Sequence, residues 1–234
     1  MNNQFRRGPF ATPPITLNLI IANFVVWLAC AILPIGDAIR EYGMLYWVGS
    51  EKFHAYQFFT YMFLHADFSH MFFNMFSLWM FGRTLEVDLG PKKFLTYFFV
   101  CGVGAALLHT GVTALEWLNL KSQIAAEASA MGQTAAQLAN RIFTNHAMLG
   151  ASGAVMGVVM SFGVLHPNAM VMLMFPPIPM KAKWFVVVYG LVELLFGVTG
   201  SFDSVAHYAH LGGMFWGWLL LLWWRYQDKK RYRY

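Results

Sequence analysis

The chain has 234 residues, of which 58% are hydrophobic and only 12% are charged. A soluble domain carries roughly 25% charged residues, so this composition excludes an ordinary water-soluble surface. The net charge of +5 does not indicate a nucleic-acid partner, because the basic residues lie at the ends of apolar stretches and in the tails. Cys30 and Cys101 lie within apolar stretches, where we expect small buried residues and no disulfide.

Six apolar stretches follow one another, and a helix needs about 20 mostly apolar residues to cross a bilayer. They predict one domain, 1–234, an all-α bundle of six membrane-spanning helices. The predicted parts are a tail at 1–14, a core at 15–224, a basic tail at 225–234, and spans at about 15–33, 68–81, 94–112, 150–166, 184–198 and 204–224.

Three connections have their own character. The second span is short, which leaves open an upstream extension through residues 58–64. The connection 113–149 is long, and its Ala-rich part, 124–143, is expected to be a helix too polar to span, which either lies on the membrane surface or extends the loop. Residues 168–182 contain four residues of sequence Pro-Pro-Ile-Pro and are expected to form a loop.

Basic residues predict the orientation of these spans. With both termini in the cytoplasm, 12 of the 16 Lys and Arg residues fall on the cytoplasmic side and 4 on the other. Positive residues accumulate on the cytoplasmic side of membrane proteins. We therefore expect both termini to be cytoplasmic. The size of the chain and the absence of a eukaryotic targeting segment favour a multi-pass protein of the inner (plasma) membrane.

The run from Gly150 to Gly153 contains the first candidate catalytic residue, Ser152. It lies where the chain enters the membrane from the outer side, and its glycines permit close approach of another backbone. Taken alone, this motif is more typical of a helix cap or a packing site. A nucleophilic serine needs a base, so the assignment depends on a second residue.

His207 and His210 lie in the first two turns of the sixth span, at a depth similar to that of Ser152. Ionisable residues at this depth are functional candidates. His210 is followed by Gly213 and Gly217, a pattern that allows tight helix packing. The two histidines alone are a weak metal motif, because no third ligand is evident, so we expect no metal.

His70 and Asn74, four residues apart, share one face of the second span and can both donate hydrogen bonds. With the backbone N–H of Ser152 they are candidates for an oxyanion hole, although a polar clamp between helices is the alternative. Near His210 in sequence the acidic residue is Asp203, which is expected to be exposed, so we favour a Ser-His dyad. Glu193, in the middle of the fifth span, is expected to make a structural hydrogen bond more readily than to relay protons.

These motifs resemble those of the rhomboid family of intramembrane serine proteases. The resemblance covers about 56–217 and rests on 65–74, on 150–153 and on 209–217, where a glycine three residues after His210 sets the register. It implies a six-helix core with a water-filled cavity, no metal or cofactor, and cleavage of transmembrane protein substrates within the lipid bilayer. It also implies a mobile loop at about 199–203.

The sequence departs from the family pattern at two places that bear on the site. Tyr56 and Gln57 occupy the place of a tryptophan and an arginine in the first loop, which puts the anchoring of that loop in question. Met156 replaces an aromatic residue that packs on the catalytic histidine, although a thioether can also contact a ring edge. The residues expected to support the site are Gly150, Gly153, Met156, Gly213 and Gly217.

Two other classes of function remain open at this stage. A non-enzymatic rhomboid-like protein that binds membrane clients is disfavoured, because both catalytic positions are filled. A small transporter or channel would line its path with intramembrane polar residues, but no internal repeat supports it. The oligomeric state is not indicated by the sequence.

Overall fold

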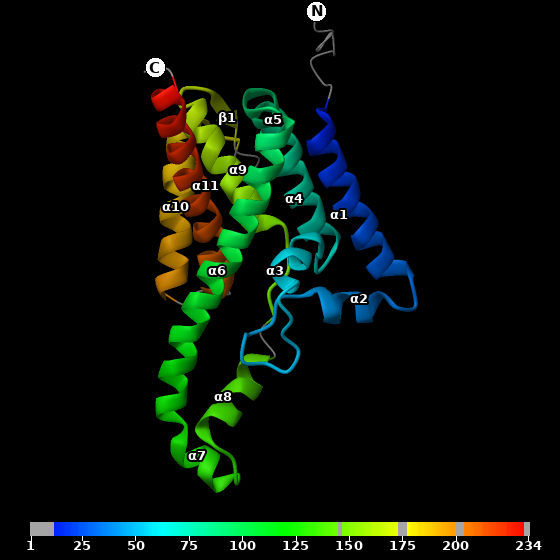
Figure 1. Ribbon diagram of the computed structural model, residues 1–234, viewed down its shortest axis with the longest axis vertical. Helices are drawn as coiled ribbons and strands as arrows, with labels where there is room; N and C mark the ends of the chain where they lie inside the picture. The colour runs from blue at the N-terminus through cyan, green and yellow to red at the C-terminus, as the bar shows by residue number, and fades with distance from the viewer. Residues whose placement is uncertain (1–11, 145–146, 173–176, 200–203, 232–234) are drawn as a thin grey trace, which may run out of the picture.

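A computed structural model describes residues 12–144, 147–172, 177–199 and 204–231 as a helical bundle with a long helical extension (Figure 1). Residues 200–203 of the loop expected at 199–203 lie outside the described residues, as do residues 1–11 of the N-terminal tail and 232–234 of the C-terminal tail. The elements are α1 (Pro14–Ile32), α2 (Gly36–Gly43), α3 (Gln57–Thr60), η1 (Tyr61–Phe63), α4 (Phe68–Ser77), η2 (Leu78–Gly82), α5 (Arg83–Leu89), α6 (Pro91–Gln123), α7 (Ala125–Ala130), α8 (Ala135–Thr144), α9 (Ser152–Leu165), β1 (Met170–Met172), β2 (Pro179–Lys181), α10 (Ala182–Thr199) and α11 (Ser204–Arg231).

Three of the described helices, α1, α6 and α10, are long and apolar enough to cross a membrane. Their outward faces carry exposed apolar side chains, such as Val25 on α1 and Leu191 on α10. Buried polar residues such as Asn23 and Glu193 face the interior. This arrangement suits lipid as the surrounding solvent, because lipid offers no hydrogen bonds to polar groups. The chain is therefore a multi-pass membrane protein.

The helix of the predicted second span begins at Phe68, and the upstream extension through 58–64 is wrong. Residues 57–63 form the separate short helices α3 and η1, and the chain is extended at Leu64. Asp67 then caps α4 by accepting the backbone N–H of His70 at 2.8 Å. An N-cap side chain replaces a hydrogen bond that the helix itself cannot supply. This cap fixes where the helix starts and hence where His70 and Asn74 lie.

Helix α6 is longer than the predicted third span, because it continues beyond the bundle to Gln123. Helices α7 and α8 follow it and fold back along its end, at the opposite end from the start of α1 and the end of α11 (Figure 1). The prediction of a helix at 124–143 is partly correct, since Gly132 breaks it with a φ of 67°. Asn140 accepts hydrogen bonds from the indoles of Trp47 and Trp117, which joins the extension to the first loop.

Two further details of the fold bear on the sequence predictions. The segment 168–182 is not only a loop, because β1 and β2 pair in an antiparallel hairpin before α10. The first loop is anchored by Gln57, which is fully buried. Its amide donates to the carbonyls of Tyr42 and Lys52, and its oxygen accepts from the N–H groups of Tyr46 and His54. Gln57 thus anchors the loop where the sequence left the anchoring in question.

Candidate active site

The segment before α9 is held from two sides, and it presents Ser152 at the first position of the helix. Leu45 and Met148 exchange two backbone hydrogen bonds of 2.9 Å, and the N–H of Gly150 donates to the carbonyl of Tyr61 at 3.0 Å. Gly150 has a φ of 126°, a conformation that favours glycine. The first N–H groups of a helix have no partner within it, so the Ser152 N–H is available to a ligand.

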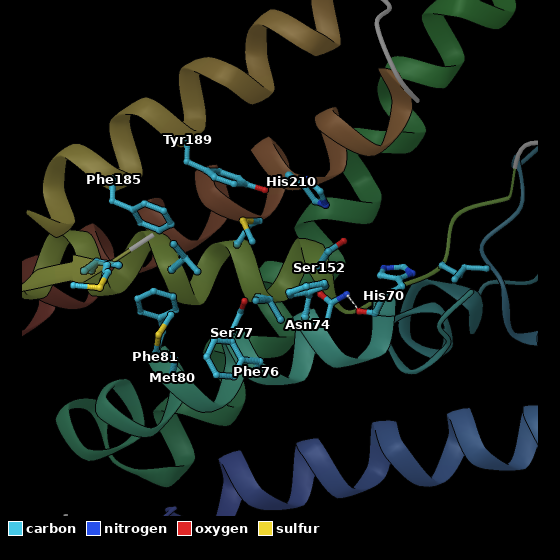
Figure 2. Close-up of a pocket in the computed structure, with 17 residues that line it drawn as sticks. His70, Asn74, Phe76, Ser77, Met80, Phe81, Ser152, Phe185, Tyr189 and His210 are labelled. Carbon is cyan, nitrogen blue, oxygen red and sulfur yellow. Dashed lines mark hydrogen bonds between the residues drawn. The ribbon is translucent and has the colours of Figure 1, made fainter. Parts of the chain in front are cut away.

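Helices α9 and α11 touch at backbone distance, which brings Ser152 and His210 to one cavity. A Cβ added at Gly213 would overlap the backbone carbonyl of Gly153, and one added at Gly153 would lie 3.4 Å from the carbonyl oxygen of Ala209. Glycine at position 213 permits this contact, because any side chain there would meet the backbone of α9. Figure 2 shows the Ser152 hydroxyl between the rings of His210 and His70 in that view.

Helix α4 places His70 on the other side of the serine. A Cβ added at Gly150 would lie 2.8 Å from Nε2 of His70 and 3.7 Å from the Ser152 hydroxyl oxygen. The backbone N–H of Ala66 donates to Nδ1 of His70 at 3.5 Å. This bond favours the tautomer with the proton on Nε2, so the ring offers an N–H toward the serine.

Asn74 lies one turn after His70 and is 7% exposed. Its amide nitrogen donates to the carbonyl of His70 at 2.9 Å (Figure 2). An amide has two N–H groups, so the second remains for a molecule in the cavity. The geometry therefore gathers two side-chain donors and one backbone donor near the serine hydroxyl.

The cavity that these groups share has a volume of about 630 Å³ and is lined mostly by apolar side chains. It lies between α4 and η2 on one side and α10 on the other, with α9 behind it. Met156 lines the same cavity as His210, and so do Phe185 and Tyr189 of α10. A cavity of this kind suits an apolar ligand with one polar group at the serine end.

In sequence the acidic residue near His210 is Asp203, but the fold brings a second one, Glu193 of α10, to the same histidine. The buried carboxylate of Glu193, on α10, accepts a hydrogen bond of 2.6 Å from Nδ1 of His207. Its other oxygen lies 3.1 Å from Nδ1 of His210. The structural hydrogen bond expected of Glu193 is therefore present, and the same carboxylate also meets the candidate base. It is also a third group that can ligate a metal, where the sequence offered only the two histidines.

Sequence reasoning missed Tyr189 as a site residue. Its hydroxyl points toward His210 in Figure 2, and it interacts with Glu193 one turn later on α10. The spacing of four residues between Tyr189 and Glu193 was the available signal, because such residues share one helical face. Of the supporting glycines, Gly213 makes the expected close approach to the backbone of α9. An added Cβ at Gly217 would overlap Tyr97, and one at Gly153 would lie 2.5 Å from Cβ of Ala105, so these two glycines make room for α6.

Comparison with known proteins identifies the family. The rhomboid domain matches residues 52–227, which include every residue of the site described above. Rhomboid protein 1, mitochondrial, of Saccharomyces cerevisiae is 28% identical over 155 residues, which are 66% of this chain and 38% of that protein. The chain thus spans well under half the length of that relative. Since the family match extends over most of its residues, the chain belongs to the rhomboid family.

Proposed function

We propose that the protein is an intramembrane serine endopeptidase that cleaves transmembrane protein substrates. The observation that carries the proposal is the single cavity lined by Ser152, His210, His70 and Asn74, which come from three separate helices. A serine and an imidazole with donors beside them are the parts that acyl transfer needs. Membership of the rhomboid family supports the same activity.

The chemistry assigned to Ser152 and His210 is that of a dyad. His210 takes the proton of Ser152 through Nε2 as the hydroxyl oxygen attacks the substrate carbonyl. The tetrahedral intermediate carries its negative charge on the former carbonyl oxygen. The Nε2–H of His70, the amide of Asn74 and the N–H of Ser152 donate to that oxygen. His210 then protonates the leaving amine and activates the water that hydrolyses the acyl-enzyme.

The shape and lining of the cavity support an apolar substrate. A transmembrane segment brings apolar side chains, which the methionine and phenylalanine residues between α4 and α10 can contact. Its peptide bonds are hydrogen-bonded within a helix, so the segment must unwind locally before its carbonyl can reach Ser152. We therefore propose substrates whose transmembrane segments unwind easily. We propose no metal or cofactor for this chemistry.

The proposed arrangement in the membrane has six spans, both termini in the cytoplasm of an inner (plasma) membrane, and one domain over 1–234. The start of α1 and the end of α11 lie at the same end of the bundle, which fits an even number of crossings (Figure 1). The start of α9 faces the other end, toward the α6–α8 extension. In this orientation Ser152 opens to the outer side of the membrane.

Labelling with a fluorophosphonate probe and cleavage of a purified single-span membrane protein test the proposal together. We expect the wild type to be labelled and to cleave, and Ser152→Ala and His210→Ala to do neither. Labelling retained in Ser152→Ala would remove the serine from its role. Binding of the substrate by the wild type without cleavage or labelling would instead favour a client-binding protein.

A further inference from the structure

Glu193 holds a position that the dyad chemistry does not use. It is 5% exposed, in the middle of α10, and its two carboxylate oxygens face Nδ1 of two different histidines on α11. We infer that Glu193 is the positioning residue of the catalytic base, because it holds His210 with its proton on Nδ1 and its Nε2 lone pair free for Ser152. This inference rests on the proposed serine protease function.

The surroundings of His210 Nδ1 leave Glu193 as its acceptor. This nitrogen is buried and makes no in-line hydrogen bond to any residue that the structure describes. The Glu193 oxygen 3.1 Å away lies at hydrogen-bonding distance but off the N–H direction. A small rotation of the ring aligns the two. A buried N–H without a partner is destabilising, which favours that rotation.

The tautomer of His210 then follows from the charge of Glu193. A carboxylate accepts hydrogen bonds and donates none, so both histidines that face it must carry their protons on Nδ1. The Nε2 atom of His210 is then left with a lone pair, which a general base requires. When that atom takes the serine proton, the ring becomes cationic beside the carboxylate, and the attraction between them is strong where water is scarce.

If Glu193 acted only through its hydrogen bond to His207, its role would be to join α10 to α11. The experiment must distinguish this structural role from the positioning of His210. Glu193→Gln keeps the size of the side chain but introduces an amide N–H₂ that can donate to Nδ1. That donation favours the proton on Nε2 of His210 and removes the lone pair that faces Ser152. The same kind of substitution in a serine-protease triad lowers kcat by about 10⁴-fold.

Two control variants test whether the loss of a structural hydrogen bond is by itself enough to slow the reaction. His207→Phe removes the 2.6 Å bond to Glu193 and keeps an aromatic ring beside Phe196. Glu86→Gln is the matched isosteric change at a second buried glutamate, whose carboxylate accepts the backbone N–H groups of Ile15 and Thr16 away from the cavity. Glu86→Gln perturbs hydrogen bonding away from His210, whereas His207→Phe keeps an aromatic ring at the position whose ring lies 6.5 Å, edge to face, from that of His210.

The full-length protein in detergent is assayed for the rate of fluorophosphonate labelling, for kcat and KM, and for melting temperature. We expect Glu193→Gln to lower the labelling rate and kcat by about 100-fold or more with KM nearly unchanged. We expect both controls to label within about 3-fold of wild type even where they melt earlier. Ring ¹⁵N resonances of His210 should move toward the Nε2–H tautomer in Glu193→Gln alone.

Several results would overturn the inference. One is a Glu193→Gln protein that labels at the rate of the wild type, and another is a His207→Phe protein that is slowed as much as Glu193→Gln. A third is activity that EDTA abolishes and zinc restores, since the three residues would then be a metal site. Failure of the wild type to be labelled would instead sink the protease proposal itself, so the two failures are distinguishable.

Discussion

Replacement of Gly213 by alanine tests the contact that brings α9 and α11 together. The added Cβ would overlap the carbonyl of Gly153, which is backbone and cannot swing aside as a flexible side chain would. Since non-bonded heavy atoms prefer separations of about 3.5–4.0 Å, the two helices must move apart by roughly 1.5–2 Å at this point. Overpacking of this kind costs about 1–3 kcal/mol of stability.

The effect on rate should be larger than the effect on stability. A misplacement of about 1 Å between reacting groups lowers a rate by on the order of 100-fold. Gly213→Ala moves the helix that carries His210 relative to the one that carries Ser152. We therefore expect a protein that is folded below its lowered melting temperature and that reacts with a fluorophosphonate about 100-fold more slowly than wild type.

Gly111→Ala is the matched control on α6. An added Cβ there meets nothing within 4 Å, so the substitution adds a methyl group in open space. Because glycine within a helix is less stable than alanine by roughly 0.5–1 kcal/mol, this variant should melt no earlier than wild type and label at the same rate. If Gly213→Ala labels as fast as Gly111→Ala, the close approach of α9 and α11 is not what aligns the dyad.

Three further predictions concern the surroundings of the site. Gln57→Ala removes the partner of four backbone groups and should lower the free energy of unfolding by about 2–4 kcal/mol in chemical denaturation; an unchanged midpoint would contradict its anchoring role. The hydroxyl of Ser69, and then the capped backbone N–H, lower the pKa of Asp67 below its usual 3.8, so its stabilisation is present above that value and is lost as the pH falls through the lowered one. The gap in melting temperature between wild type and Asp67→Ala should therefore close in acid. Asn140→Ala leaves two indole N–H groups without their acceptor and should speed tryptic cleavage within 113–149 while fluorophosphonate labelling stays unchanged.

Much of the helical order could be predicted because apolar runs of about 20 residues have few alternatives to a membrane helix. The starts of α1 and α9 are within two residues of those expected. The length of α6 could not be predicted, because its last turns are stabilised by α7 and α8 packing back against it rather than by lipid. The hairpin of β1 and β2 was hidden for a similar reason, since three-residue strands carry little periodicity of their own.

The candidate site also has a part that local sequence motifs predict and a part that depends on how the helices pack. Ser152, His210, His70 and Asn74 could be proposed from local motifs, and the structure brings them to one cavity. The contact between Glu193 and His210 could not be predicted from local motifs, because it depends on how α10 is rotated about its axis relative to α11. No sequence pattern within either helix predicts that rotation.

The rotation of α10 follows from the membrane itself. Its outer face carries apolar residues such as Leu195, 58% exposed, and Val198, 70% exposed, and such a surface suits contact with lipid. Lipid supplies no hydrogen bonds, so the carboxylate of Glu193 must turn toward donors on a neighbouring helix. Gly190 and Gly197 lie on the face of α10 that also carries Glu193. An added Cβ at Gly190 would come to 3.3 Å from Met214 of α11, and one at Gly197 to 3.3 Å from Tyr208, so these glycines permit α11 to approach closely.

One carboxylate thus fixes both the rotation of α10 and the environment of the proposed base. The rotation of α10 needs only a hydrogen-bond acceptor at position 193, whereas the tautomer of His210 depends on the negative charge there. Glutamine at position 193 retains an oxygen that can accept the His207 hydrogen bond, so α10 should keep its rotation and most of its packing. It loses the negative charge that faces His210, and with it the preference for the reactive tautomer. A variant that keeps the fold and loses the chemistry is therefore the outcome that this arrangement requires.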